Sequence, residues 1–549
     1  MLKRLFILLL ISYTTVNQLF ASHLGFEKPF NIDTLKQRNW VDSLMKSMTL
    51  HEKIAQSVMV AAFSNKDQKH VDEISALVRN EQIGGLCFFQ GGPVRQARLT
   101  NLYQSMVKIP LLISIDGEWG LGMRLDSTIS FPKQMMLGAA ADPNLVYQVA
   151  ADIAKQLKRM GIQMNFAPVV DVNNNPQNPV ISTRSFGEDR NMVARFGLEY
   201  MRGLQYNGVL ACAKHFPGHG DTDADSHFAL PKINHPYHRL DSLEFFPFKE
   251  LINNGVDAVM IAHLRVPTLE KDSTLASSFS KSVIKGVLTD SLKFNGLIFT
   301  DALNMKGASN LRNPVELNYL AYKAGNDFLL YPEKAKESID YIENEVRKGN
   351  FSIEEVNKKC RKILMAKYKV GLSKYRPVAI QNLVSDLNKP SSEVIRRKAI
   401  EGGIILLTGK ELIPLKRLDT LRIAYVEVGK TKGNAFREQL EDYASIASFS
   451  INPESTVNAY DSLLNVLDTF NLVIVGYHST ELKATKNYGV SEQSANFIFD
   501  LSFRKKVIVD IFGNPYTINR IMNIPSLSGL IVSFDNSNLT QSLSAQMIF

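Results

Sequence analysis

Short apolar segments that alternate with helix-like stretches constrain the fold of this chain more than any other feature. Each segment is apolar throughout rather than at every second position, which is typical of parallel strands buried on both faces. In the first part of the chain they lie at 83–89, 111–116, 164–172, 209–215, 256–263, 296–301 and 327–332. A helix is expected from Thr49, where Thr49 and Glu52 form a capping box ahead of Ile54, Ala55 and Val58. These repeated strand–helix units predict a (β/α)8 TIM-type barrel over residues 36–372.

A second series of strand-like segments follows a polar stretch, 373–393, which we interpret as a linker. The segments lie at 402–409, 421–429, 470–478, 505–513 and 527–536, and helical stretches separate them. They predict a smaller α/β sandwich domain with a parallel sheet over residues 394–549. The last residues resemble an amphipathic helix that stops at an apolar face.

The first 22 residues have the pattern of a signal peptide. Lys3 and Arg4 precede an apolar run at 5–11, and Ala21 ends a small-residue cleavage site. This run is far shorter than the ~20 apolar residues of a membrane-spanning helix. The pattern therefore predicts an exported, periplasmic protein with no stable membrane insertion after cleavage.

Composition excludes several classes of protein. The chain has 549 residues and only three cysteines, Cys87, Cys212 and Cys360, which are too far apart for a disulfide framework or a cysteine-based zinc module. The formal net charge of +9 is spread over 63 basic and 54 acidic residues without a block of like charges. This distribution favours a basic globular protein over a nucleic-acid-binding one, and it is compatible with an anionic polymer as surroundings or substrate.

Ionisable side chains follow five of the predicted barrel strands. In such barrels, polar residues just past the strand C-termini line the active face. Any one of these residues could be a structural hydrogen-bonding group, but burying five such groups without a shared purpose is costly. The residues are Asp116, Asp171, Lys214 with His215, His263 and Asp301.

The densest group of polar residues lies in the segment 214–227, KHFPGHGDTDADSH, whose glycines and proline predict a loop. A metal site is one interpretation, because the aspartates at 221, 223 and 225 imitate a calcium loop. That interpretation fails, since Ser226 stands where the loop needs glycine and Lys232 where it needs glutamate. No HExxH or similar zinc pairing is present either.

Two other interpretations of this loop remain open from the residues alone. It is either a structural connection or an acid/base loop in which Asp225 orients and polarises His227. A histidine with an ordinary pKa near 6.5 exchanges protons at neutral pH, and a carboxylate partner holds it ready to do so.

Several motifs, in the correct order, resemble those of the β-N-acetylhexosaminidases of glycoside hydrolase family 3, of the type that acts in peptidoglycan recycling. The similar segments are DGEWGLGMR (116–124), NFAPVVDVNNNPQNPVISTRSFGED (165–189), KHFPGHGDTDADSH (214–227), FTDALNMKGA (299–308) and GGIILLTGKELIPLK (402–416). Trp119 and Gly122 depart from the family's usual glycine and valine, which puts the local loop shape in question. The resemblance covers roughly residues 40–549.

This resemblance implies a retaining glycosidase mechanism with no metal and no organic cofactor. Asp301 would be the nucleophile, His227 the acid/base and Asp225 its partner. Asp171 and His263 would support the mouth of the barrel, and His219 stays unassigned. The residues implied to hold the sugar hydroxyls and the N-acetyl group are Asp116, Arg124, Arg184, Lys214 and His215.

The implied substrate is a carbohydrate, namely an N-acetylglucosaminide derived from peptidoglycan or related to it. One alternative is another family 3 specificity, such as a β-glucosidase, which the sequence Asp225-Ser226-His227 disfavours. A second is an N-acetylglucosaminide phosphorylase, since a histidine acid/base would not repel phosphate as a carboxylate would. The alternative from another class is a non-catalytic glycan-binding protein, which would be expected to have lost Asp225, His227 or Asp301.

Overall fold

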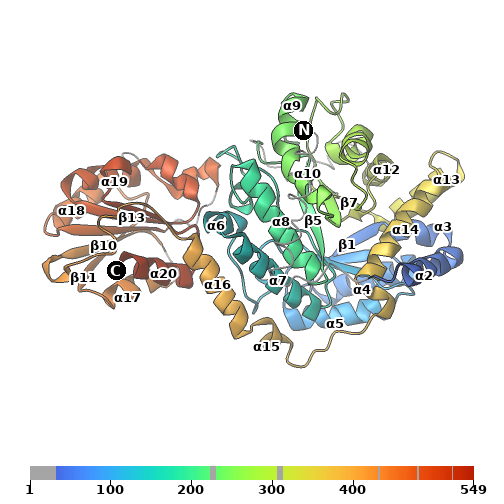
Figure 1. The fold of residues 1–549 in the computed structure, drawn as a ribbon, viewed down its shortest axis with the longest axis horizontal. Coiled ribbons are helices and arrows are strands. Elements are labelled where there is room, and N and C mark those ends of the chain that lie inside the picture. Colours follow the sequence, from blue (N-terminus) through green and yellow to red (C-terminus); the bar gives the residue numbers. More distant parts are fainter. Residues whose placement is uncertain are drawn as a thin grey trace, which may run out of the picture.

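The computed structural model describes residues 32–222, 230–305, 313–430, 433–478, 481, 483–521 and 524–549. The predicted signal peptide and the predicted acid/base pair, Asp225 and His227, therefore lie outside the described residues. The helices and strands are arranged in two domains, with a barrel on one side and a smaller sheet domain on the other (Figure 1). In the described part of the chain, no helix is both long and apolar enough to cross a membrane.

Eight parallel strands form the barrel in the order β7-β6-β5-β4-β3-β2-β1-β8. A further parallel bridge between Phe299 and Phe328 joins the two ends of this series. The (β/α)8 TIM-type architecture predicted from the sequence is thereby confirmed. The strands are β1 (Val58–Ala62), β2 (Gly85–Phe88), β3 (Leu112–Ile115), β4 (Met164–Asn165), β5 (Leu210–Phe216), β6 (Ala258–Ile261), β7 (Leu297–Thr300) and β8 (Leu329–Leu330).

Helices surround this sheet, and apolar side chains pack on both of its faces. The interior layer includes Cys87 and Cys212, which are buried free thiols, as is Cys360. The barrel helices are α2 (Thr34–Ser47), α3 (Leu50–Ala55), α4 (Gln68–Ala76), α5 (Pro93–Gln104), α6 (Gln134–Ala139), α7 (Pro143–Arg159), α8 (Arg190–Tyr206), α9 (Tyr237–Arg239), α10 (Phe245–Asn253), α12 (Pro314–Ala324), α13 (Ala335–Arg347) and α14 (Ile353–Lys369).

The first barrel strand was missing from the sequence prediction. The capping box of Thr49 and Glu52 is present, but the helix that it begins, α3, ends at Ala55. Val58, which we had placed on the helix, is instead the first residue of β1. Only Gln56 and Ser57 separate the apolar end of the helix from the apolar start of the strand, and both are buried, so periodicity alone does not mark the boundary.

The second domain contains a six-stranded sheet in the order β11-β10-β12-β13-β14-β9. The expected parallel sheet is corrected to a mixed one, because β9 pairs with β14 in the antiparallel direction. Strand β11 was also missed; only its last residue is buried, so it lacks an apolar run. The strands are β9 (Ile405–Thr408), β10 (Ile423–Gly429), β11 (Ile446–Ile451), β12 (Leu472–His478), β13 (Lys506–Phe512) and β14 (Gly529–Val532).

Helices cover both faces of this sheet. Figure 1 shows α18 (Val457–Leu467) and α19 (Glu492–Arg504) on one face, and α17 (Ala435–Glu441) and α20 (Asn538–Ile548) on the other. Two apolar clusters fill the layers between sheet and helices. The segment that we interpreted as a linker contains a short helix, α15 (Leu383–Leu387), and the start of α16 (Pro390–Gly403), which leads into the second domain.

Candidate active site

A cavity of about 560 Å³ lies at the C-terminal ends of the barrel strands. Its walls bring together the six predicted site residues that fall within the described part of the chain, although they are spread over much of the barrel sequence. These are Asp116, Arg124, Arg184, Lys214, His215 and Asp301. A shared position is expected, because residues at the C-terminal ends of barrel strands meet at the same face. The role of each residue stays a prediction.

Glu118 organises the charges on one wall of the cavity, and the sequence analysis did not single it out. Its carboxylate accepts two hydrogen bonds from Arg184, at 2.6 and 2.9 Å, and an ion pair from Lys214 at 2.7 Å. Glu118 and Lys214 are only 1% and 2% exposed. Burial alone would raise the pKa of Glu118, but Arg184 and Lys214 hold it well below its usual range.

Asp116, which belongs to the same segment as Glu118 (116–124), connects this network to Arg124. One carboxylate oxygen accepts a hydrogen bond from Lys214 at 2.5 Å, and the other accepts one from Arg124 at 2.6 Å. Burial lowers the pKa of Lys214, but Asp116 and Glu118 outweigh it and hold the pKa above its usual value. The sequence did contain a signal for Glu118, because it is the second acidic residue of the segment DGEWG, whose first residue is Asp116.

Asp171 fixes the position of His215. It is fully buried and lies 2.7 Å from His215 Nδ1, and it also accepts the backbone N–H groups of His215 and His219. On the other side of the ring, Nε2 faces Arg184 Nη2 at 3.3 Å. Because a guanidinium group only donates, we assign the proton to Nδ1 and the lone pair to Nε2.

Asp301 follows β7 and lines the same cavity. Its Oδ1 accepts the N–H of Ala302 at 2.7 Å, and its own N–H donates to the carbonyl of Ile261. Burial raises the pKa of Asp301, but His215 and His263 outweigh it and hold the pKa below its usual value. Asp301 is therefore ionised at neutral pH, as a carboxylate nucleophile must be.

Two further histidines lie near these residues, and one of them, His219, also lines the cavity. His263 is fully buried, with Nδ1 2.6 Å from Ser278 Oγ and Nε2 3.1 Å from the carbonyl of Ala302, so it supports the segment that holds Asp301. His219 is 1% exposed, and its Nδ1 lies 2.8 Å from Thr222 Oγ1. Burial, reinforced by His215, lowers the pKa of His219 to about 4, so the ring is neutral at pH 7.

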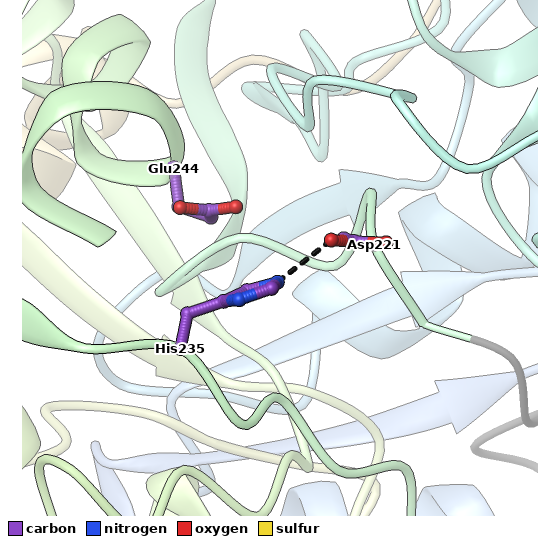
Figure 2. A group of neighbouring side chains, drawn as sticks. All are labelled: Asp221, His235 and Glu244. Atoms are coloured by element: carbon purple, nitrogen blue, oxygen red, sulfur yellow. Dashed lines mark hydrogen bonds and ion pairs between the residues drawn. The ribbon is translucent and has the colours of Figure 1, made fainter. Parts of the chain in front are cut away.

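Asp221 and His235 lie on either side of the segment that contains the predicted acid/base pair, and they contact each other at 2.7 Å. Figure 2 shows them close to Glu244, a grouping of donor types that could hold a metal ion. However, Arg239 donates to both carboxylate oxygens of Glu244 at 2.7 Å and lies 3.9 Å from Asp221. The guanidinium group already supplies the positive charge that these carboxylates need, so the donor set does not fit a cation site.

The second domain holds the segment that carries Arg184. Tyr516 Oη donates to Glu188 Oε1 at 2.7 Å and accepts from Asn173 Nδ2 at 2.9 Å. Asn514 Nδ2 donates to Ser182 Oγ at 2.8 Å, and Tyr488 donates to the carbonyl of Pro176. These hydrogen bonds hold the stretch 173–188, which belongs to the barrel domain, against the second domain.

Comparisons with known proteins agree with this geometry. The model of the family described as "Glycosyl hydrolase family 3 N terminal domain" matches residues 49–366. The curated "Beta-hexosaminidase A" of Pseudoalteromonas piscicida is 28% identical over 455 residues, which are 76% of this chain and 75% of that protein. The "Beta-N-acetylglucosaminidase/beta-glucosidase" of Cellulomonas fimi is 26% identical over 398 residues, 71% of this chain and 70% of that one.

A solved structure is similar over both domains. It is a glycoside hydrolase family 3 β-N-acetylglucosaminidase from Paenibacillus sp. str. FPU-7, with a TM-score of 0.77 and 31% sequence identity. The similarity covers 91% of this chain and 97% of that one. The order of elements and the pairing of a barrel with a second sheet domain are thus shared.

Proposed function

Because the chain belongs to glycoside hydrolase family 3, we propose that it is a retaining exo-β-N-acetylglucosaminidase. The observation that carries the proposal is the cavity that the ionised carboxylate of Asp301 lines together with the charged groups of Asp116, Arg124, Arg184 and Lys214 and with the imidazole of His215. The names of the relatives support the choice of an N-acetylhexosaminide. Together with the signal-peptide pattern, they lead us to propose an exported, periplasmic enzyme for peptidoglycan-derived or related glycans.

The reaction would proceed in two displacements. Asp301 attacks the anomeric carbon, the bond to the leaving oxygen breaks, and His227 gives that oxygen its proton. A water molecule then attacks the anomeric carbon of the glycosyl–Asp301 ester and gives a proton to His227, while the bond between that carbon and Asp301 breaks. Asp225 stabilises the imidazolium during the second displacement. The roles of His227 and Asp225 rest on the resemblance of the DSH segment to the family motif.

The charged wall explains how the site would select its sugar. Arg184, Lys214 and Arg124 present N–H groups in fixed directions because Glu118 and Asp116 hold them. A site built to hydrogen-bond particular groups rejects analogues that lack them, since buried charges would then lose their partners. A sugar without the N-acetyl group should therefore react more slowly.

The test is a comparison of two aryl glycosides. We expect wild-type enzyme to release p-nitrophenol much faster from the β-N-acetylglucosaminide than from the β-glucoside, and Asp301→Ala to lower kcat/KM by on the order of 10⁴-fold. Asp290→Ala, at an exposed barrel position, serves as the matched control and should leave both rates unchanged. Equal or inverted rates for the two substrates would overturn the proposed specificity.

The same assay run with and without phosphate separates hydrolysis from phosphorolysis. Hydrolysis predicts free N-acetylglucosamine as the only sugar product in both cases. Formation of the sugar 1-phosphate at the expense of the free sugar would instead assign the phosphorylase alternative.

A further inference from the structure

A second cavity, of about 420 Å³, lies where the barrel meets the second domain. The barrel contributes the segment 130–136, which includes the start of α6, and the second domain contributes α16 and the segments that follow β13 and β14. Figure 1 shows α6 and α16 at this junction. In the part of the chain that the structure describes, no residue lines both this cavity and the one that contains Asp301. The two cavities are therefore separate.

Most of the lining of this interdomain cavity is apolar. Its volume falls in the range of small-molecule sites, which is about 300–1,000 Å³. Ligands of open α/β sheets bind beyond the carboxyl ends of the strands, and β13 and β14 present that end to the cavity. The apolar lining residues include Trp119, Phe131, Met135, Met136, Ile400 and Phe534.

Phe534 has a strained backbone at this position. Its φ of 56° lies in the left-handed region, which is unfavourable for a residue with a bulky side chain. Such strain persists only where the surrounding structure enforces it, and it is concentrated at active sites and ligand-binding positions. The strain at Phe534 therefore agrees with a ligand site beyond β14.

Lys133 brings a positive charge into this apolar cavity. It is half-buried, and its Nζ lies 5.4 Å from the centroid of the Trp119 ring. It forms no ion pair with any described residue, so Asp535 and Glu118 act on it only from a distance. Burial lowers the pKa of Lys133, although these two carboxylates oppose the shift. An amine in such a place gains from a bound anion, because a buried charge is costly without a partner.

Arg396 adds a second positive charge from α16. Its Nη1 pairs at 2.9 Å with Glu393, which precedes it on the same helix and does not line the cavity. The charged groups among the described lining residues are thus two cations, Lys133 and Arg396, and one carboxylate, Asp535. This balance favours an anionic ligand, since a neutral one would leave Lys133 without a partner and a cationic one would be repelled.

We propose that the interdomain cavity is a second ligand site, which binds a small carboxylate that carries an apolar ring. The carboxylate pairs with Lys133 and Arg396, and the ring packs against Trp119 and Phe534. This inference goes beyond the proposed glycosidase function and does not depend on it.

The chain connects this site to the active-site cavity at two points. Trp119 directly follows Glu118, and Thr183, which also lines the interdomain cavity, directly precedes Arg184. Glu118 and Arg184 are themselves hydrogen-bonded at 2.6 Å. A ligand that shifts Trp119 or Thr183 therefore also shifts the charged wall of the active site. Occupancy of the second site and turnover are then coupled.

Trp119 provides a direct measure of binding. The chain has two tryptophans, and Trp40 lies in α2, where its ring contacts that of Tyr368. Trp40→Phe thus leaves the fluorescence of Trp119 as the signal from the cavity. The probes are 3-phenylpropionate, its neutral amide 3-phenylpropanamide, and acetate, so that the carboxylate and the ring are tested separately.

Three variants in the Trp40→Phe background test the charged groups. Lys133→Met and Arg396→Met each remove one cation of the cavity. Arg397→Met is the matched control, because Arg397 is exposed on the same helix as Arg396 and does not line the cavity.

We expect 3-phenylpropionate to change the fluorescence of Trp119 saturably and to bind about tenfold more tightly than its amide, with acetate the weakest. Lys133→Met should abolish the preference for the carboxylate. Arg396→Met should reduce this preference about two- to threefold, because Arg396 is shared with Glu393. Arg397→Met should bind all three probes as the Trp40→Phe parent does.

The coupling is tested with the aryl N-acetylglucosaminide. Saturating 3-phenylpropionate should change kcat/KM of the Trp40→Phe parent by about twofold or more, and the same concentration should leave that of Lys133→Met unchanged. A fluorescence change without any change in kcat/KM would overturn the coupling.

The absence of a saturable fluorescence change would overturn the second site, as would equal binding of acid and amide or a preference for the acid that survives Lys133→Met. A protein without glycosidase activity that still binds 3-phenylpropionate with these preferences would overturn the proposed function and support the second site.

Discussion

Glu118 carries the charge balance of the cavity wall at the scale of single residues. It stands between Arg184 and Lys214, and both ion pairs are largely removed from water. Removing one partner of a buried charge pair leaves the others uncompensated, which costs far more than the pair itself contributes. The arrangement therefore makes the positions of two proposed sugar-binding cations depend on one carboxylate.

Glu118→Gln should destabilise the protein by about 3–5 kcal/mol and lower kcat/KM by on the order of 10²-fold, because the amide replaces a charge that both Arg184 and Lys214 need. Urea unfolding and steady-state kinetics measure the two effects. Glu401→Gln is the matched control, since Glu401 pairs with Arg397 on the half-exposed surface of α16 and should matter little. Wild-type activity in Glu118→Gln would contradict the role that we give to this residue.

At this scale, the sequence predicted the position of a site residue when that residue directly follows a strand. Asp116, Lys214 and Asp301 follow apolar runs, so the barrel pattern alone places them at one end of the sheet. Glu118 follows no strand directly, and its importance comes from Arg184, which lies 66 positions away. Such partners are defined only by the folded chain.

At the scale of elements, apolar runs in the sequence identified the strands in the middle of a sheet but not every strand at its edge. Strands β2 and β12 are buried along their whole length and were predicted, whereas the edge strand β11 is partly exposed and was not. The reversed direction of β9 was not predicted either, because an apolar run has the same composition in both directions. Strand existence therefore follows from burial, and strand direction follows from the path of the chain between α16 and the sheet.

The stretch 173–188 is the element that connects the second domain to the proposed chemistry. Tyr516→Phe removes the hydroxyl group that contacts Asn173 and Glu188, and a buried hydrogen-bonding group left without its partner costs about 1–3 kcal/mol. Because Arg184 belongs to this stretch, we expect kcat/KM to fall about three- to tenfold. Thermal unfolding and steady-state kinetics provide the measurements.

Tyr460→Phe offers the matched control for this element. Its hydroxyl group donates to the carbonyls of Asn452 and Pro453 within the second domain, far from the barrel side of the sheet. It should lower stability without changing kcat/KM. Equal kinetic effects of the two substitutions would show that the contact of Tyr516 with the barrel has no special role.

The stability of the whole molecule depends on buried groups in both domains that respond to pH in opposite directions. Burial lowers the pKa of His219 in the barrel and of His478 in the second domain to about 4. Between pH 6.5 and 4 the unfolded chain binds protons at these positions and the folded chain does not, so both histidines make the fold less stable as pH falls. Burial of Asp510 raises its pKa to about 7, so this carboxyl group has the opposite effect over much of the same range.

Asp510→Asn isolates this opposing contribution. Asp510 lies within β13, is fully buried, and accepts hydrogen bonds from Ser533 at 2.8 Å and from Ser544. Its raised pKa means that it stabilises the folded state at low pH and that this contribution is lost as pH rises through about 7.

The asparagine does not titrate, so the variant should gain stability relative to wild type by on the order of 2 kcal/mol between pH 5 and pH 8. Urea-unfolding midpoints at the two pH values measure the change, and the exposed Asp461→Asn should show none. A stability difference between Asp510→Asn and wild type that is the same at both pH values would show that Asp510 stays ionised inside the sheet, and the acid response of the protein would then rest on the histidines.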